Sequence, residues 1–307
     1  MGDDRAERAT RCVLLFGGSG QVGRQLLNAM AALGKVVAPT RAEADLTDPG
    51  SLREVIARLT PAIVINCAAV TNVDQAEREP ALARAVNEIA PGVMAEASRD
   101  VGAVFVHYST DYVFDGEATE PYNEESRPNP INIYGASKLG GEQRISEAGG
   151  PHLIIRTSWV YSATGTGFVA TLLRELPTKD TIRVVADQVG SPTWSYSLAC
   201  ATTAILRGVI TRDEVALDRK DWGIYHLAGS GAGSRVEIAE TLIGALSALD
   251  ENAPRPRIVP ISSAEFAAAA PRPHYSALSN TRAARRFGVA LDPWRDELRR
   301  MLMQRSV

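Results

Sequence analysis

The chain contains 307 residues, of which 45% are hydrophobic and 22% charged, and its 33 basic and 36 acidic side chains leave a net charge of −3. Such a composition excludes a disordered or collagen-like chain, and the lack of a basic excess argues against a nucleic-acid partner. Three widely spaced cysteines argue against a disulfide framework or a zinc site and predict a cytoplasmic protein. No apolar run approaches the roughly 20 residues of a membrane span, so we predict no membrane partner.

Short apolar runs alternate with segments of helical spacing through the first half of the chain. A charged N-terminal tail, residues 1–11, precedes them and is expected to be mobile. The predicted strands are residues 12–16, 35–38, 62–67, 104–108 and 153–156. The predicted helices are residues 21–34, 51–59 with Ser51 as N-cap, and 80–100, followed by one that begins near Tyr134. This alternation predicts an α/β fold with a Rossmann-like, doubly wound parallel sheet.

The alternation loosens beyond about residue 162. Helical stretches near residues 168–176, 196–206 and 236–249 are separated by long irregular pieces. We therefore expect a dinucleotide-binding Rossmann domain over residues 12–161. Residues 162–307 are expected to form mainly a smaller C-terminal substrate-binding lobe, from which some segments return to the Rossmann domain.

A glycine-rich turn follows the first predicted strand and opens the first predicted helix. It contains Gly17, Gly20 and Gly23. Glycines at such a turn allow a tight bend, backbone contact with a pyrophosphate and close helix–strand packing. The helix N-terminus adds unpaired N–H groups and a positive dipole. A plain structural turn is the alternative, but the strand–turn–helix context favours a dinucleotide site.

The end of the second predicted strand bears on the choice of nucleotide. A carboxylate that binds the ribose 2′-OH of NAD is expected about 20 residues after the glycine turn. Residues 38–41 contain no carboxylate and end in Arg41, a cation that can face a 2′-phosphate. We therefore predict NADPH as cofactor, with NADH as the alternative, and a solvated Arg41 as the alternative to a phosphate ligand.

Tyr134 and Lys138 lie four residues apart, so on a helix both side chains share one face. A free phenol has a pKa of about 10, and a neighbouring ammonium favours the phenolate and lowers that pKa. The same ammonium can bind ribose hydroxyls. A surface helix pair is the alternative. Ser109 and Thr110 follow the fourth predicted strand, at the sheet edge where ligands bind, and either hydroxyl can hydrogen-bond a substrate carbonyl.

Several motifs together resemble the extended short-chain dehydrogenase/reductases and, within them, the dTDP-4-dehydrorhamnose reductase family. These motifs are residues 14–23, 45–48, 66–69 with Thr71 and Asp74, 108–116, 134–138, 156–161, 187–193, and 272–274 with Ser276 and Leu278. The resemblance runs from residue 12 to about residue 300. The motifs after Tyr108 separate this family from other extended members.

The resemblance implies a reductase that transfers a hydride from a nicotinamide to C4 of a dTDP-4-keto-6-deoxyhexose. It makes Tyr134 the general acid, Lys138 its tuner and ribose ligand, and Thr110 the hydroxyl that polarises the ketone. The implied sugar contacts are Thr110, Asp111 and Trp159. With the glycine turn and Arg41, the implied cofactor contacts are Gly17, Gly20, Gln21, Val22, Gly23, Arg41, Asp45, Leu46, Ala68, Ala69, Val70, Thr71, Tyr134 and Lys138.

Some features leave alternatives open. Asn87 matches either the asparagine that orders a proton-relay water in this superfamily or a core polar residue that bends a helix. Gly167 and the stretch 196–198 depart from the family pattern, so the sugar can be another deoxysugar, such as one attached to a secondary metabolite. His107 and His226 are interpreted as core histidines. A homodimer is an open alternative to a monomer.

Two other functions compete with the reductase. One is a partner protein, since the regulatory subunit of methionine adenosyltransferase also resembles this family. The other is a nucleotide-sugar 4-epimerase, which shares the fold but retains its cofactor without net consumption. The presence of Thr110, Tyr134 and Lys138 together favours the reductase.

Overall fold

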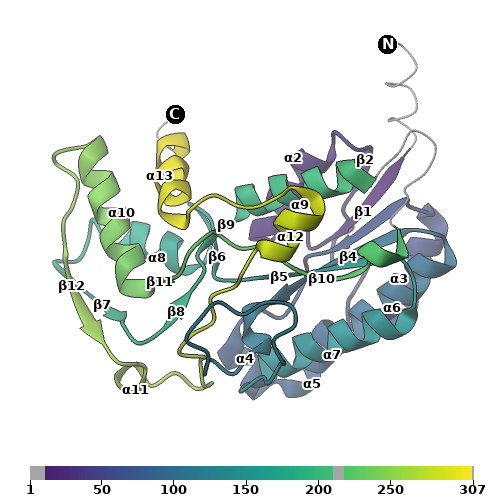
Figure 1. Ribbon diagram of the computed structural model, residues 1–307, viewed down its shortest axis with the longest axis horizontal. Helices are drawn as coiled ribbons and strands as arrows, with labels where there is room; N and C mark the ends of the chain where they lie inside the picture. The colour runs from purple at the N-terminus through teal and green to yellow at the C-terminus, as the bar shows by residue number, and fades with distance from the viewer. Residues whose placement is uncertain (1–10, 210–217, 306–307) are drawn as a thin grey trace, which may run out of the picture.

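The computed structural model describes residues 11–209 and 218–305, so the predicted tail lies, up to residue 10, outside the described residues (Figure 1). A six-stranded parallel sheet with strand order β10-β5-β4-β3-β1-β2 forms its centre. The strands are β1 (Cys12–Phe16), β2 (Lys35–Val37), β3 (Ile63–Asn66), β4 (Val104–Thr110), β5 (His152–Thr157) and β10 (Gly223–His226). The predicted doubly wound α/β sheet is confirmed. Within the described ranges, no helix is long and apolar enough to cross a bilayer.

Helices cover both faces of this sheet. On one face, α2 (Gln21–Met30) packs beside α9 (Ser195–Val209), and on the other lie α3 (Pro49–Leu59), α6 (Ala90–Asp100) and α7 (Ile133–Ala148). Alternate residues of a strand point to opposite faces, so β1 sends Val13 and Leu15 into one core and Leu14 and Phe16 into the other. Burial on both faces explains why the central strands are nearly continuous apolar runs.

The helix boundaries differ from the predicted ones where a cap or a bend decides them. Helix α3 begins at Pro49, and Asp48 rather than Ser51 caps it, by accepting a hydrogen bond from the Gly50 N–H. A proline suits the first helical position because its missing N–H would have had no partner there. Helix α2 ends at Met30. The predicted helix 80–100 is divided into α5 (Pro80–Arg84), a π-helical turn η1 (Ala85–Ile89) and α6, and α4 (Val73–Arg78) precedes it.

Much of the C-terminal part builds a second core. Its strands form three two-stranded pieces, and its helices include α8 (Phe168–Glu175), α10 (Arg235–Leu249), α11 (Ser263–Phe266) and α13 (Trp294–Arg305). The paired strands are β7 (Thr181–Val185) with β12 (Arg257–Ile261), β8 (Val189–Gly190) with β11 (Gly233–Ser234), and β6 (Val160–Tyr161) with β9 (Thr193–Trp194). Helix α9, strand β10 and helix α12 (Thr281–Phe287) pack instead with the central sheet and α2.

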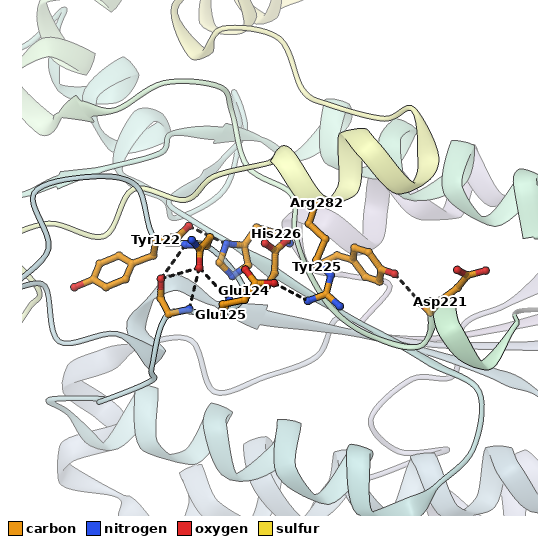
Figure 2. Close-up of polar contacts among 9 residues, drawn as sticks. Tyr122, Glu124, Glu125, Asp221, Tyr225, His226 and Arg282 are labelled. Carbon is orange, nitrogen blue, oxygen red and sulfur yellow. Dashed lines mark hydrogen bonds and ion pairs between the residues drawn. The ribbon is translucent and has the colours of Figure 1, made fainter.

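Polar contacts attach the edge strand β10 to a loop about 100 residues earlier in the chain, and an ion pair joins the same loop to α12 (Figure 2). The backbone N–H of His226 donates to Glu124 at 2.8 Å, and its ring Nδ1 donates to the Tyr122 carbonyl at 3.1 Å. Arg282 of α12 lies 3.6 Å from Glu125. Burial and the nearby Arg156 lower the pKa of His226 to about 3, so this histidine is a neutral, buried strand residue. The loop that contains Tyr122 and Glu124 thus anchors the last strand of the sheet.

Candidate active site

The glycine turn at the carboxyl end of β1 is sterically closed to side chains. Gly17 has φ +84°, and a Cβ there would lie 2.6 Å from the Ala68 nitrogen. A Cβ on Gly23 would lie 2.0 Å from the Gly17 carbonyl oxygen. Gly20 is the N-cap of α2, and no described side chain caps that helix. The first N–H groups of α2 therefore stay available to an anionic ligand.

The loop after β3 is the second wall of this site, and asparagine amides hold it. Asn66 accepts a hydrogen bond from the Ala68 N–H at 3.0 Å. Asn87, in the π-helical turn, accepts from the Val70 N–H at 2.9 Å and donates to the Val70 carbonyl at 3.1 Å. It also donates to the Ser137 hydroxyl at 3.1 Å. Asn87 therefore fixes the backbone of a predicted cofactor residue, and its role in ordering a relay water stays a prediction.

The remaining predicted cofactor residues lie around these two loops. Gln21 accepts a hydrogen bond at 2.9 Å from Ser162, which follows β6. Val22, Leu46 and Ala68 are partly buried against the two cores of the sheet. Ala69 and Thr71 belong to the loop after β3.

Arg41 has a partner that the sequence analysis did not assign to it. Its Nε lies 3.3 Å from the Asp45 carboxylate, and their side chains are 80% and 37% exposed. Hydrogen bonds from Thr47 and the charge of Arg41 hold the pKa of Asp45 below its usual range. A carboxylate therefore lies beside Arg41, although residues 38–41 themselves contain none. Such an exposed ion pair contributes little, so a phosphate can compete for Arg41.

Tyr134 lies in the first turn of α7, beside the last residue of β4. The side chain of Asn132 caps α7 by accepting from the Gly135 N–H at 2.8 Å. The Tyr134 phenol hydrogen-bonds Thr110. Burial raises the pKa of Tyr134 above its usual value, the hydrogen bond to Thr110 opposes this, and the charge of Asp111 adds to the rise. The phenol is therefore protonated at neutral pH and suited to proton donation.

The two hydroxyls left open by the sequence have different surroundings. Successive strand residues point to opposite faces, and the Ser109 hydroxyl donates to Glu142 of α7. Glu142 is also bound by Arg156 at 2.6 Å, and both side chains of this ion pair are 2% exposed. Ser109 therefore belongs to a buried ion-pair cluster, whereas Thr110 contacts Tyr134.

Asp111 is buried and accepts hydrogen bonds from three segments of the chain. Its Oδ1 accepts from Thr110 at 3.0 Å, and its Oδ2 accepts from Ser158 at 2.8 Å and from Ser276. Burial raises the pKa of Asp111 to about 6, against the effect of these hydrogen bonds. This carboxyl group therefore joins the catalytic strand end to the C-terminal part of the chain. The sequence did not reveal its serine partners, which lie far apart along the chain.

Lys138 is 1% exposed and contacts β4. Its Nζ lies 2.6 Å from the Tyr108 carbonyl oxygen and 2.9 Å from Nε2 of His107. Burial lowers the pKa of Lys138 to about 7, although the negative charge of Glu142 opposes the change. His107, interpreted from the sequence as a core histidine, is buried and also contacts this lysine. Strand alternation could have placed it on the α7 face, since Ser109 two residues later contacts α7 as well.

The Trp159 indole lies between two parts of the C-terminal lobe. A Cβ on Gly190 would lie 2.5 Å from the ring, and the Arg235 guanidinium lies 4.3 Å from the ring centroid. The indole Nε1 is buried and has no hydrogen-bond partner among the described residues. Arg235 also contacts Gln188 at 3.2 Å and lies over Phe168. Arg235 could not be predicted from the sequence, because an isolated arginine at a helix start gives no local signal.

The parallel sheet, the glycine turn and the Thr110–Tyr134–Lys138 set define a dinucleotide-dependent oxidoreductase of the short-chain dehydrogenase/reductase class. A family model described as the RmlD substrate binding domain matches residues 11–307. The chain belongs to this family, and its resemblance to the dTDP-4-dehydrorhamnose reductases is confirmed.

Individual relatives match over nearly their whole length. The dTDP-4-dehydrorhamnose reductase of Burkholderia thailandensis is 42% identical over 285 residues, which cover 92% of this chain and 95% of that protein. The crystal structure of the Bacillus anthracis dTDP-4-dehydrorhamnose reductase in complex with NADP has a TM-score of 0.85 and 35% identity, and covers 96% of this chain and 99% of that one. The structure of a Clostridium acetobutylicum dTDP-4-dehydrorhamnose reductase has a TM-score of 0.87 and 31% identity, with 96% and 100% coverage.

Proposed function

We propose that this protein uses NADPH to reduce the C4 ketone of a dTDP-4-keto-6-deoxyhexose, as the names of its relatives indicate for them. One observation carries the proposal. At the carboxyl edge of the sheet, the protonated phenol of Tyr134 is hydrogen-bonded to Thr110, and at the same edge the glycine turn leaves the start of α2 without a side-chain cap. Ligands of open parallel sheets bind at this edge.

Tyr134 and Thr110 handle the oxygen of the ketone. When bound, NADPH supplies the hydride. Tyr134 donates its phenolic proton to the oxygen that becomes the C4 hydroxyl, and Thr110 orients the phenol and offers its own hydroxyl to the same oxygen. The raised pKa of Tyr134 keeps the proton in place until negative charge develops on the substrate.

Lys138 acts one helical turn from Tyr134. Its amine is fixed by the Tyr108 carbonyl and by His107, so its remaining hydrogen-bonding capacity is directed to the nicotinamide ribose. When protonated, Lys138 lowers the pKa of Tyr134 and stabilises the phenolate left after proton transfer. Asp111 holds Thr110 and, with Trp159, is proposed to contact the sugar.

The glycine turn and its neighbours are proposed to hold the dinucleotide. Gly17, Gly20 and Gly23 admit the pyrophosphate, with Gln21 and Val22 at the start of α2. Arg41 is proposed to leave Asp45 for the 2′-phosphate of NADPH, and NADH is the alternative cofactor. The other proposed contacts are Asp45, Leu46, Ala68, Ala69, Val70 and Thr71.

The location and assembly of the protein are also proposals. Cys12, Cys67 and Cys200 are free thiols, which favours a reducing compartment such as the cytoplasm. The expectation of a homodimer can be tested by sedimentation of the purified protein with and without NADPH.

The decisive experiment follows NADPH absorbance with enzymatically made dTDP-4-keto-6-deoxysugars and identifies the product. Stoichiometric NADPH consumption with a new C4 hydroxyl supports the reductase, and comparison of sugars differing at C3 and C5 defines the substrate. Interconversion of a dTDP-6-deoxyhexose and its C4 epimer, with the oxidised cofactor regenerated and no NADPH consumed on the keto sugars, would indicate a 4-epimerase. Tight NADPH binding without turnover of any keto sugar would favour a binding subunit instead.

A further inference from the structure

Five side-chain and backbone groups form a continuous hydrogen-bonded series that includes Lys138 of the proposed active site. The Ala68 N–H donates to Oδ1 of Asn66 at 3.0 Å. The Asn66 Nδ2 lies 3.2 Å from Nδ1 of His107, and His107 Nε2 lies 2.9 Å from Nζ of Lys138. Lys138 in turn donates to the Tyr108 carbonyl at 2.6 Å.

The direction of this series is fixed at its Ala68 end. A backbone N–H can only donate, so the Asn66 atom that faces Ala68 is the oxygen, and the atom that faces His107 is the NH₂ group. That group can only donate, so Nδ1 of His107 accepts and carries no proton. A neutral imidazole then carries its proton on Nε2, directed at Lys138.

A protonated Lys138 conflicts with this direction. An ammonium has three donors and no acceptor, so two donors would face each other across the 2.9 Å contact between Lys138 and His107. If the imidazole proton lies on Nδ1 instead, it faces the NH₂ group of Asn66, so two donors meet there. If the Asn66 amide is also rotated, its NH₂ group faces the backbone N–H of Ala68, and two donors meet at that contact. A neutral amine removes it, because its lone pair accepts from His107 and one N–H donates to Tyr108.

We propose that Asn66 and His107 are positioning residues that keep the amine of Lys138 neutral in the free enzyme. The second N–H of that amine stays available to a ribose hydroxyl. The consequence for catalysis rests on the proposed function: a neutral Lys138 leaves Tyr134 as a phenol, the form that a reductase needs at the start of its cycle.

The titratable groups around Lys138 agree with a neutral amine. From its own helix, Tyr134 is a neutral phenol, and Glu142 is the one anion, already neutralised by Arg156. From the end of β3, burial raises the pKa of the Cys67 thiol to about 12, so the thiol is uncharged. From β4, burial and Lys138 itself lower the pKa of His107 well below its ordinary value.

The protonation state of the Lys138 amine can be observed directly, because the sequence contains few lysines. The sequence contains four lysines, Lys35, Lys138, Lys179 and Lys220. In protein carrying ¹³C-labelled lysine, the Cε shifts of four residues can be followed through a pH titration without cofactor or substrate, and Lys138→Met assigns the signal of interest. We expect the Lys138 signal to titrate near pH 7, well below the other three.

Asn66→Asp should reverse the direction of the hydrogen bonds between residue 66, His107 and Lys138. Oδ1 still accepts from Ala68, but a carboxylate oxygen replaces the NH₂ group, draws the imidazole proton to Nδ1 and leaves Nε2 to accept from an ammonium. The Lys138 midpoint should rise by roughly 1–3 pH units. His107→Gln is the second variant, because its amide oxygen can accept from Lys138, and it should move the midpoint in the same direction.

Asn252→Asp adds the same charge on an exposed loop and should leave the midpoint unchanged, and melting curves show which variants are folded. A wild-type Lys138 that titrates together with the other lysines overturns the proposal, as does an unchanged midpoint in the folded variants. Because the titration uses the free protein, its outcome is independent of the keto-sugar assay. A failed assay would remove the catalytic consequence and leave the protonation state of Lys138 standing.

Discussion

The polar residues of the Rossmann domain, the cofactor half, differ in their hydrogen bonding from those of the C-terminal core, the substrate lobe. Asn66, Asn87 and Lys138 are each bound to a backbone group and to a neighbouring side chain, so their orientation is fixed before any ligand arrives. In the lobe, Trp159 and Arg235 lie face to face, and the buried indole N–H has no partner among the residues described. The polar groups of the cofactor half are therefore preorganised, whereas the substrate lobe contains a buried donor that the described residues do not satisfy.

The largest effect on turnover is expected from substitution of Tyr134, in the preorganised cofactor half. Tyr134→Phe removes the proton donor and its hydrogen bond to Thr110 but keeps the ring beside Tyr112. General acid catalysis contributes roughly 100- to 10,000-fold, so kcat should fall by that factor while the NADPH dissociation constant, measured by fluorescence, changes little. Turnover within a few-fold of wild type would show that another group supplies the proton.

The second prediction concerns the buried carboxyl that joins the two regions. The pKa of Asp111 is about 6 in the folded protein, against roughly 3.9 in an unfolded chain. Because folding disfavours the ionised form, this group's favourable contribution is complete below about pH 4 and is lost as the pH rises through 6. From pH 4 to 7, the free energy of unfolding of wild type should therefore fall by about 2 kcal/mol relative to Asp111→Asn.

Urea titrations of both proteins at several pH values measure that difference. Asp115→Asn is the control, because Asp115 is an accessible carboxylate whose pKa lies below its usual range. A constant difference between wild type and Asp111→Asn across this range would show that folding does not raise the pKa of Asp111.

Much of the preorganised half could be predicted from the sequence, because local rules place its residues. The strand period, the glycine turn and the four-residue spacing of Tyr134 and Lys138 each follow from neighbours along the chain. The predicted start of α3 was wrong for a local reason, because Asp48 as N-cap and Pro49 as first helical residue form a stronger helix start than Ser51.

The remaining features depend on contacts between distant residues, which one sequence does not reveal. Strand β10 lies outside the regular strand–helix alternation of the first half of the sequence, and it is defined by its pairing with β5 rather than by a pattern of its own. The hydrogen-bond donors to Asp111 include Ser158 and Ser276, which lie 47 and 165 residues away in sequence. Trp159 and Arg235, which contact each other, are likewise far apart in sequence. The role of His107 similarly depends on Asn66 and Lys138, which flank it in space.

The third prediction tests the rim of the cofactor half, where Arg41 is exposed and paired with Asp45. If Arg41 binds the 2′-phosphate, Arg41→Ala should reduce the preference for NADPH over NADH in kcat/KM by roughly tenfold, the low end for a charge-assisted hydrogen bond. Asp45→Asn frees Arg41 and removes a repulsive charge, so it should increase the preference. Arg219→Ala removes an exposed cation beside β10, at the opposite edge of the sheet, and should have no effect. Equal use of both cofactors by wild type would make Arg41 a solvated side chain.

The smallest effect is expected in the substrate lobe, and it tests whether the unpaired indole N–H serves the sugar. Trp159→Phe keeps an aromatic ring between Gly190 and Arg235 but removes Nε1. Because Nε1 has no partner among the described residues, its loss should leave the melting temperature nearly unchanged. If the sugar supplies the acceptor, KM for the keto sugar should rise roughly fivefold, as expected for one neutral hydrogen bond, with NADPH affinity unaffected.

Trp294 provides the matched control for this change. Its indole donates to the Ala232 carbonyl at 3.2 Å, so Trp294→Phe loses a hydrogen bond within the protein and should lower the melting temperature without raising KM. If Trp159→Phe behaves in the same way as Trp294→Phe, the Trp159 ring serves only to pack the lobe. The sugar must then be recognised elsewhere along the lobe, and residues 188–193, which contact Trp159 through Gly190, become the next segment to test.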